Sequence, residues 1–159
     1  MFTKLLVANR GEIAVRIIRA CKEMGIRTVA VYSKADAESI HVALADEAIC
    51  IGEAAAKDSY LNQERIVSAA IASKAQAIHP GYGFLAENAS FANLCKKHGI
   101  AFIGPSGDLI ARMGDKDAAR RLMQQSGVPT IPGTEILEDA AAAKAAAEKI
   151  GYPVIVRPA

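Results

Sequence analysis

Short apolar runs alternate with longer amphipathic stretches along the first two thirds of the chain. Each run is four or five residues long, as is typical of buried strands. In the stretches between them, apolar residues recur every three or four positions, which indicates helices. The predicted strands are 4–8, 28–32, 48–51, 75–78 and 100–103.

Helices are predicted in the intervals, after Gly11, near 40–44, from Asn62 to Ser73 and over about 88–98. The side chains expected to face the core are Ile13, Ala14, Ile17, Ile18, Cys21, Ile66, Val67, Ala70, Ile71, Phe91, Leu94 and Cys95. Such alternation of strands and helices predicts an α/β fold with a doubly wound parallel sheet and right-handed crossovers.

The pattern changes after the fifth predicted strand. Ser106 and Asp115 are each expected to cap a helix, and the second of these helices ends near Gly127. Residues 138–150 are rich in Ala, Glu and Lys, which are strong helix formers, and the apolar run 154–156 then predicts a buried strand.

We expect a domain boundary near 130–134, which gives a first domain over 1–130 and the beginning of a second over 131–159. The second part is too short to bury a core of its own, because even stabilised domains need roughly 40 residues. The strand at 154–156 is therefore expected to lack its partners.

Composition and charge exclude several classes of protein. The chain is 52% hydrophobic and 23% charged, as soluble globular proteins are, and its net charge of +2 is spread without a basic block. We therefore expect no nucleic-acid partner and no membrane surface. No apolar stretch is long enough to cross a membrane and no signal peptide is visible, so a cytoplasmic location is expected.

The three cysteines, Cys21, Cys50 and Cys95, are far apart and have no metal-ligand spacing, so we interpret them as buried small hydrophobic residues. A catalytic thiol is the alternative, but no Cys has a neighbouring base in the sequence. Motifs for a phosphate loop, a zinc protease or a serine hydrolase are absent, as is a carboxylate pair at metal spacing. No catalytic or metal-binding residue is predicted.

The segment HPGYGF follows the fourth predicted strand, at the sheet edge where doubly wound folds bind ligands. Its glycines would let backbone amides approach a ligand, Tyr82 offers a ring and a hydroxyl, and His79 offers an imidazole. The structural alternative is a tight turn in which the glycines take positive φ and His79 caps a neighbour.

GYGFLA also satisfies the dinucleotide-binding pattern G-x-G-x-x-G/A. The bulky Tyr82 and Phe84 count against a dinucleotide, as does the position after the fourth strand, since that fingerprint normally follows the first strand.

Three further places carry charge that suggests binding. Lys116 falls in the first turn of a helix, where a cation is unfavourable unless it binds an anion; the alternative is a solvated Lys screened by neighbouring Asp residues. Arg157 follows an apolar run and could reach a phosphate or a carboxylate. Arg16, Arg19 and Glu23 form one helical stripe, which is either a solvated face or a subunit contact.

The order and spacing of several segments carry a resemblance: LLVANRGEIAVRIIRACKEMGIRTVAVYS, ADEAICIG, SYLN, AIHPGYGFLAENA, FIGP, MGDK, GVPTIPG and IGYPVIV. Together they closely resemble the N-terminal part of biotin carboxylase, the ATP-grasp component of biotin-dependent carboxylases. The resemblance covers essentially the whole chain. It implies that the doubly wound domain is the pre-ATP-grasp domain and that 131–159 begin the ATP-grasp domain.

The resemblance also implies an activity. Biotin carboxylase is an ATP-dependent ligase that activates bicarbonate to carboxyphosphate and carboxylates biotin on a carrier protein, with Mg²⁺. ATP, Mg²⁺ and biotin are therefore expected in the complete enzyme, with none bound tightly by this chain. The sequence ends before the family's glycine-rich lid, its magnesium carboxylates and its bicarbonate-binding arginine, so the chain alone is expected to be inactive.

Individual residues match family positions. Lys116 matches a lysine that contacts ATP, and the loop with His79, Tyr82 and Gly83 matches the one that faces biotin and bicarbonate. The stripe of Arg16, Arg19 and Glu23 matches a dimer contact, which implies a homodimer.

Arg157 stands where the family has an ATP-contacting lysine, and this RP ending is similar to carbamoyl-phosphate synthetase, another ATP-grasp enzyme. Part of such an enzyme, or a stand-alone nucleotide-binding module with a Rossmann-like fold, are the alternative functions.

Overall fold

The computed structural model describes residues 2–114, 116–134 and 137–156, and for residues 116–118 the backbone alone. The chain divides into two compact units, Met1–Ala111 and Arg112–Ala159, each of which is described by itself. Within the described residues, no helix combines the length and the apolar character that a membrane span requires.

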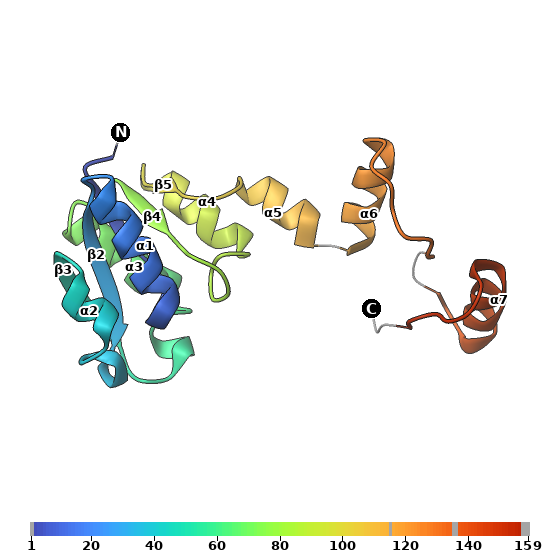
Figure 1. Ribbon diagram of the computed structural model, residues 1–159, viewed down its shortest axis with the longest axis horizontal. Coiled ribbons are helices and arrows are strands. Elements are labelled where there is room, and N and C mark those ends of the chain that lie inside the picture. Colours follow the sequence, from blue (N-terminus) through green and yellow to red (C-terminus); the bar gives the residue numbers. More distant parts are fainter. Residues whose placement is uncertain (1, 115, 135–136, 157–159) are drawn as a thin grey trace. The chain divides into compact units, whose positions relative to one another are not determined.

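Five parallel strands form the sheet of the first unit (Figure 1). They are β1 Lys4–Val7, β2 Arg27–Ser33, β3 Glu47–Gly52, β4 Ala77–His79 and β5 Ala101–Phe102. Their order in the sheet is β3-β2-β1-β4-β5. The chain thus adds β2 and β3 on one side of β1, and then crosses over and adds β4 and β5 on the other side. The predicted doubly wound parallel sheet is confirmed, and β1 and β4 flank the point at which the strand order reverses.

Helices connect the strands at the predicted places, and a further helix, α5, follows the last strand. They are α1 Gly11–Glu23, α2 Ile40–Leu44, α3 Gln63–Ala72, α4 Ala89–Lys97 and α5 Gly107–Gly114, with 3-10 turns η1 Lys34–Asp36 and η2 Ala56–Asp58. Two of these helices are capped by side chains at their amino ends. The Asn62 side chain accepts a hydrogen bond from the Arg65 amide in α3, and the Ser106 hydroxyl accepts one from the Leu109 amide in α5.

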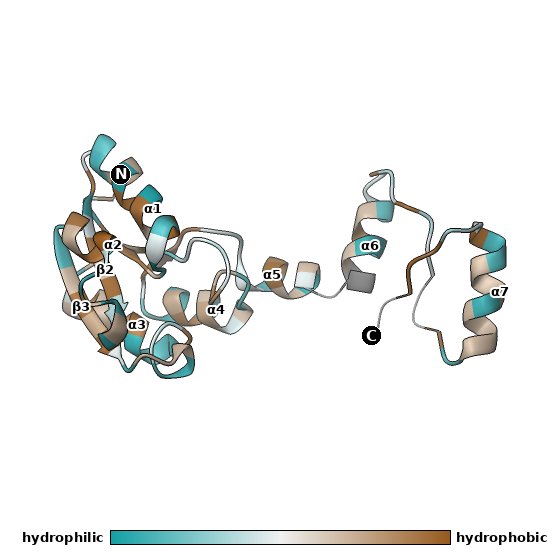
Figure 2. Ribbon diagram, turned by 60° about the horizontal axis from the view of Figure 1, so that its bottom comes forward, coloured by the Kyte–Doolittle hydropathy of each residue, from teal (hydrophilic) through white to brown (hydrophobic). Residues whose placement is uncertain are grey.

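Two hydrophobic clusters lie on opposite faces of the sheet. Because successive strand residues point to opposite faces, Leu6 packs in one cluster and Leu5 in the other. The cluster around Leu6 contains residues of α3 and α4, and the cluster around Leu5 contains residues of α1. Figure 2 shows the corresponding mixture of hydrophobic and hydrophilic positions along α1.

Two predictions about buried side chains are wrong. Cys50 is exposed because β3 is an edge strand and Cys50 points away from the face on which Ile49 and Ile51 pack. Ile71 is also exposed, since the buried face of α3 is centred on Ile66 and Ala70 and Ile71 lies at its margin. Cys21 and Cys95 are buried, as predicted, and burial raises the pKa of both thiols.

The second unit contains α6 Lys116–Gln125 and α7 Ala140–Ile150. The Arg120 guanidinium donates to the carbonyl oxygens of Gly133 at 2.7 Å and Thr134 at 3.2 Å, which holds this segment against α6. The helix predicted over 138–150 is confirmed, and the Asp139 side chain caps it by accepting from the Ala142 amide. The domain boundary near 130 stays a prediction.

The predicted strand at 154–156 is wrong for this chain. These residues form no strand, and Ile155 and Val156 are 82% and 79% exposed. A strand is stable only when its backbone groups pair with a neighbour, and no strand is present in the described part of the second unit. Asp115, the predicted cap of α6, and Arg157 lie outside the described residues.

Candidate functional site

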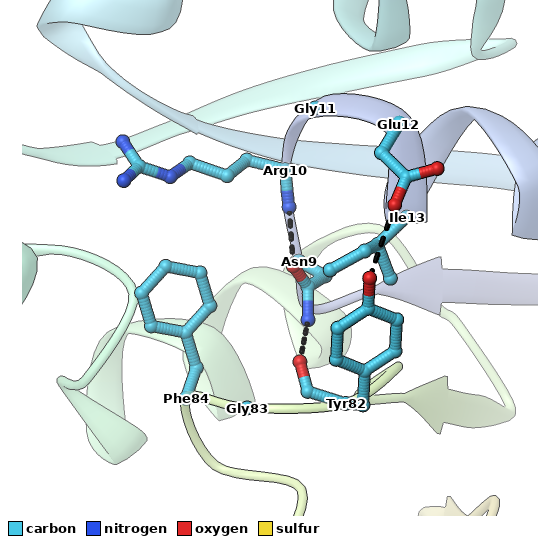
Figure 3. A pocket seen from close by; sticks show the side chains of 8 residues that line it. All are labelled: Asn9, Arg10, Gly11, Glu12, Ile13, Tyr82, Gly83 and Phe84. Carbon is cyan, nitrogen blue, oxygen red and sulfur yellow. Dashed lines mark hydrogen bonds between the residues drawn. The ribbon is translucent and has the colours of Figure 1, made fainter.

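A pocket of about 440 Å³ lies beyond the carboxyl ends of β1 and β4, where the strand order reverses (Figure 3). Two segments line it: the start of α1 with the residues before it, and the loop between β4 and α4. We call residues 79–84, which are the last residue of β4 and the first part of that loop, the glycine loop. The lining residues are Asn9, Arg10, Gly11, Glu12, Ile13, Tyr82, Gly83 and Phe84. In open α/β sheets, this is the place where ligands bind.

Asn9 joins the two segments. Its side chain is fully buried, and its amide Nδ2 donates to the carbonyl oxygens of Pro80 at 2.7 Å and Tyr82 at 2.9 Å. Its Oδ1 accepts from the backbone amide of Arg10 at 2.9 Å. The chain after β1 and the glycine loop are therefore fixed to each other through one side chain, as Figure 3 shows in part.

The backbone of the glycine loop has a left-handed character, with φ of 67° at Gly81, 70° at Gly83 and 41° at Phe84. A Cβ atom at Gly81 would lie 2.6 Å from Ile13 Cγ2, so only glycine allows the loop this close to α1. Gly83 has open space around it, which leaves its backbone accessible.

His79 forms a hydrogen bond with the backbone of the glycine loop. Its Nδ1 accepts from the Gly81 amide at 3.0 Å, and burial of the half-buried ring lowers the pKa of His79. The features of the tight-turn alternative, positive φ at both glycines and a cap by His79, are thus present. They leave Tyr82 and Gly83 exposed at the tip of the loop.

Arg10 places a cation beside the pocket. Its guanidinium lies over the rings of Tyr60 and Phe84, 5.4 Å and 5.5 Å from their centroids, and the two rings stack with their centroids 5.1 Å apart. Arg10 Nη1 also lies 3.5 Å from Asp36 Oδ2. The guanidinium is thereby oriented, while about half of the side chain stays exposed.

A hydrogen-bond network stands behind Arg10. Asp36 Oδ2 accepts from the hydroxyls of Tyr60 at 2.7 Å and Ser33 at 2.8 Å, and the Tyr60 hydroxyl accepts from the Ser33 amide. Partial burial acts to raise the pKa of Asp36, but these hydrogen bonds and Arg10 outweigh it and the pKa is lowered. Burial, followed by the bond to Asp36, raises the pKa of Tyr60 to about 12.

Tyr82 projects from the glycine loop with 64% of its surface exposed. Its hydroxyl donates to Glu12 Oε1 at 3.0 Å (Figure 3). This hydrogen bond and the carboxylate charge raise the pKa of Tyr82, and the nearby Arg16 acts in the opposite direction. The phenol is therefore a neutral donor whose ring stands at the rim of the pocket.

Arg157 lies outside the described residues, and the other predicted site residues fall into three groups. His79, Tyr82 and Gly83 come together on the glycine loop. Arg16, Arg19 and Glu23 are all exposed along α1. Lys116 is the first residue of α6, as predicted, but its side chain is not described.

The dinucleotide fingerprint gains no support from the geometry. In such sites the glycine turn opens directly into a helix whose first amides bind the pyrophosphate. Here α4 begins only at Ala89, after a further turn in which the Ala86 amide donates to the Gly83 carbonyl oxygen. Among the described residues, no group of three His, Cys, Asp or Glu side chains could hold a metal ion.

The residues that organise the pocket were not predicted from the sequence; they are Asn9, Arg10, Glu12, Asp36 and Tyr60. A signal for the first three was present, because Asn9-Arg10-Gly11-Glu12 directly follows the first strand, where a doubly wound sheet binds ligands. Asp36 and Tyr60 gave no such signal, since their pairing depends on how distant loops meet.

Two family models match the chain. Residues 1–110 match the model described as biotin carboxylase, N-terminal domain, and residues 115–159 match carbamoyl-phosphate synthase L chain, ATP binding domain. Biotin carboxylase 1 of Bacillus subtilis is 60% identical over 99% of this chain, and biotin carboxylase of Pseudomonas aeruginosa is 54% identical over 100% of it. The chain spans about a third of the length of these curated relatives, 35% and 36%.

Solved structures agree with the sequence comparisons. A biotin carboxylase complex with β,γ-ATP from Campylobacter jejuni has a TM-score of 0.90 and 49% identity over 96% of this chain and 34% of its own. The biotin carboxylase domain dimer of a 2-oxoglutarate carboxylase from Hydrogenobacter thermophilus, in complex with MgADP, ADP and bicarbonate, has a TM-score of 0.88 and 56% identity, over 96% of this chain and 34% of its own.

Proposed function

The chain belongs to the biotin carboxylase N-terminal domain family, and we propose on that premise that it is the N-terminal part of an ATP-dependent biotin carboxylase. The proposed reaction uses ATP and bicarbonate to carboxylate biotin on a carrier protein. It concerns a polypeptide that also contains the remaining two thirds of the length of the curated relatives, because this chain covers only about a third of them.

One observation carries the proposal: relatives named biotin carboxylase are 54–60% identical across almost all of this chain, including both matched segments. The site is compatible with it. The glycine loop stands at the sheet edge where ligands bind, with an exposed Tyr82 and an accessible Gly83 backbone at its tip.

The pocket suits the two small ligands. Ring and aliphatic surface from Tyr82, Phe84 and Ile13 can cover a compact apolar group such as the bicyclic ring of biotin, and the Arg10 guanidinium, which is paired with Asp36, adds a half-exposed positive charge beside it. We therefore assign the loop with His79, Tyr82 and Gly83 to the face that meets biotin and bicarbonate.

The nucleotide contacts are proposed from the matched segments alone. Lys116 begins a helix whose amino end favours an anion, so we assign it and Arg157 to ATP, with Mg²⁺ bound by residues beyond the described part of this chain. The model matched by residues 115–159 is described as an ATP binding domain, which supports this assignment.

The partners of the proposed enzyme are a biotin carboxyl carrier protein and a second copy of the enzyme. The Hydrogenobacter thermophilus domain is described as a dimer, and the stripe of Arg16, Arg19 and Glu23 is exposed on α1 and available for such a contact. The cytoplasmic location stays a prediction, because one similar relative, from Populus trichocarpa, is named as chloroplastic.

The experiment is an ADP-release assay on the complete polypeptide that contains this chain. With Mg²⁺ and ATP, we expect ADP release that requires bicarbonate and that free biotin stimulates. Omission of bicarbonate is the matched control. If the rate of ADP release does not change when bicarbonate or biotin is omitted, the proposed function is wrong.

A carbamoyl-phosphate-synthetase-like enzyme is the second candidate, since residues 115–159 match that model and the chain continues with Arg157-Pro158. The same assay separates the two. Ammonia in place of biotin should leave ADP release unstimulated, and formation of carbamoyl phosphate would favour the second candidate.

A further inference from the structure

Two residues of the segment that follows β1 form hydrogen bonds with Tyr82. One binds the backbone of Tyr82 and the other binds the Tyr82 side chain. Asn9 Nδ2 bonds the Tyr82 carbonyl oxygen at 2.9 Å, and Glu12 Oε1 accepts from the Tyr82 hydroxyl at 3.0 Å. Figure 3 shows both contacts, with Tyr82 between them. A residue that is 64% exposed is thereby restrained at both ends.

Asn9 is suited to fix a backbone. Its side chain is inaccessible to solvent, so loss of its bonds would leave the buried carbonyl oxygen of Pro80 without a donor among the described residues. The close approach of Gly81 adds to the restraint, because the Cβ position of Gly81 lies 2.9 Å from Asn9 Nδ2. The loop therefore has little freedom to shift along Asn9.

Glu12 is suited to fix a side chain. Glu12 lies on the exposed first turn of α1. Because its carboxylate is charged, the hydrogen bond that it accepts from the Tyr82 hydroxyl is stronger than one between two neutral groups. Without that bond, an exposed Tyr ring would sample several rotamers. The bond thus restricts which direction the ring faces at the rim of the pocket.

We propose that Asn9 and Glu12 are positioning residues of the biotin site, Asn9 by setting the path of the glycine loop and Glu12 by setting the direction of the Tyr82 ring. This inference rests on the proposed function. Both residues act through Tyr82 and its loop, and neither needs to contact biotin itself.

The role of Glu12 is tested by a double-mutant cycle in the complete polypeptide, with free biotin as substrate and ADP release as the signal. Glu12→Ala and Tyr82→Phe should each raise the KM for biotin by about five-fold, with the KM for ATP unchanged. If Glu12 acts through the Tyr82 hydroxyl, the double variant should resemble Tyr82→Phe alone. Effects that multiply to about 25-fold would overturn the role of Glu12.

The role of Asn9 is tested with Asn9→Ala, with Asn62→Ala as the matched control. The Asn62 side chain also accepts a hydrogen bond from a backbone amide, but Asn62 caps α3 and does not line the pocket. Asn9→Ala should raise the KM for biotin about ten-fold and accelerate amide hydrogen exchange over residues 81–86, whereas Asn62→Ala should change neither. Unchanged exchange and KM in a folded Asn9→Ala variant would overturn the inference.

Failure of the proposed function gives a different result. A wild-type protein without biotin-stimulated ADP release contradicts the function, and the hydrogen exchange then still decides whether Asn9 fixes the loop. If Asn9→Ala does not fold, Asn9→Ser keeps one donor and should show a smaller acceleration of exchange over the same residues. Exchange identical to that of the wild type in Asn9→Ser would contradict the restraint.

Discussion

His41 is an imidazole with 1% exposure, next to the network that orients Arg10. Its Nε2 lies 3.3 Å from the Val31 carbonyl oxygen, and its Nδ1 has no partner among the described residues. Burial lowers the pKa of His41 and Arg10 lowers it further, against the opposing effects of Val31 and Asp36. The folded chain therefore keeps this ring neutral.

A neutral buried His makes stability depend on pH. The unfolded chain binds a proton below a pKa of about 6.5, whereas the folded chain resists protonation, so the unfolding free energy falls as pH decreases from about 7 to 5. We expect His41→Gln to weaken this fall, although His79, whose pKa is also lowered, maintains part of it. Urea unfolding at both pH values measures it, with the exposed His98→Gln as control.

The two variants at His41 and His98 give a clear contrast. If His41→Gln retains the complete pH dependence of the wild type while His98→Gln weakens it, the assignment of a buried neutral imidazole is wrong.

The glycine loop and α1 pack against each other through one glycine, Gly81. Gly81 and Gly83 share a left-handed φ, 67° and 70°, but only Gly81 meets neighbours, Ile13 and Asn9. Gly83→Ala should cost about 1–2 kcal/mol of unfolding free energy from backbone strain alone. Gly81→Ala should cost about 1–3 kcal/mol more, because its Cβ overpacks the contact.

Urea unfolding of the two alanine variants measures this difference with the backbone strain held nearly equal. Equal losses of stability would show that the loop does not pack against α1 as described.

The sequence predicted the elements whose signals are local. The strand at β1 and the helix at α3 were predicted within about two residues, because an apolar run and an Asn cap are visible in the chain itself. The strand at 154–156 was predicted by the same reasoning and is absent, since an apolar run becomes a strand only where another strand pairs with it. The predicted burial of Cys50 was wrong for a similar reason, because its exposure depends on the position of β3 at the edge of the sheet.

The candidate site was predicted in part. The glycine loop was predicted because glycine, an aromatic ring and an imidazole after a strand are recognisable in sequence. The contacts of Asn9 with Tyr82 and of Tyr60 with Asp36 link residues 73 and 24 positions apart, so they depend on the register of the sheet. No local pattern specifies such pairs.

The stripe of Arg16, Arg19 and Glu23 is the proposed contact between two copies of the enzyme. All three side chains are exposed, and no ion pair found among the described residues includes them. Arg16→Glu combined with Arg19→Glu should convert a dimer of the complete polypeptide to monomers, because the stripe would then carry carboxylates alone, with no arginine left to offset Glu23 across a two-fold axis.

Sedimentation velocity at one protein concentration measures the change. Lys96→Glu with Lys97→Glu, an equal charge reversal on the exposed end of α4, should leave the dimer intact. Dimers that persist in the α1 variant, or that dissociate in both, would contradict the proposed interface.

The glycine loop, held beside β1, is proposed to face biotin and bicarbonate. The decisive experiment for this proposal is a crystal structure of the complete polypeptide with biotin, bicarbonate and MgADP. We predict both ligands against Tyr82 and Gly83, beyond the carboxyl ends of β1 and β4, with the Tyr82 hydroxyl still bonded to Glu12. Ligands bound with no contact to residues 79–84 would contradict the claim.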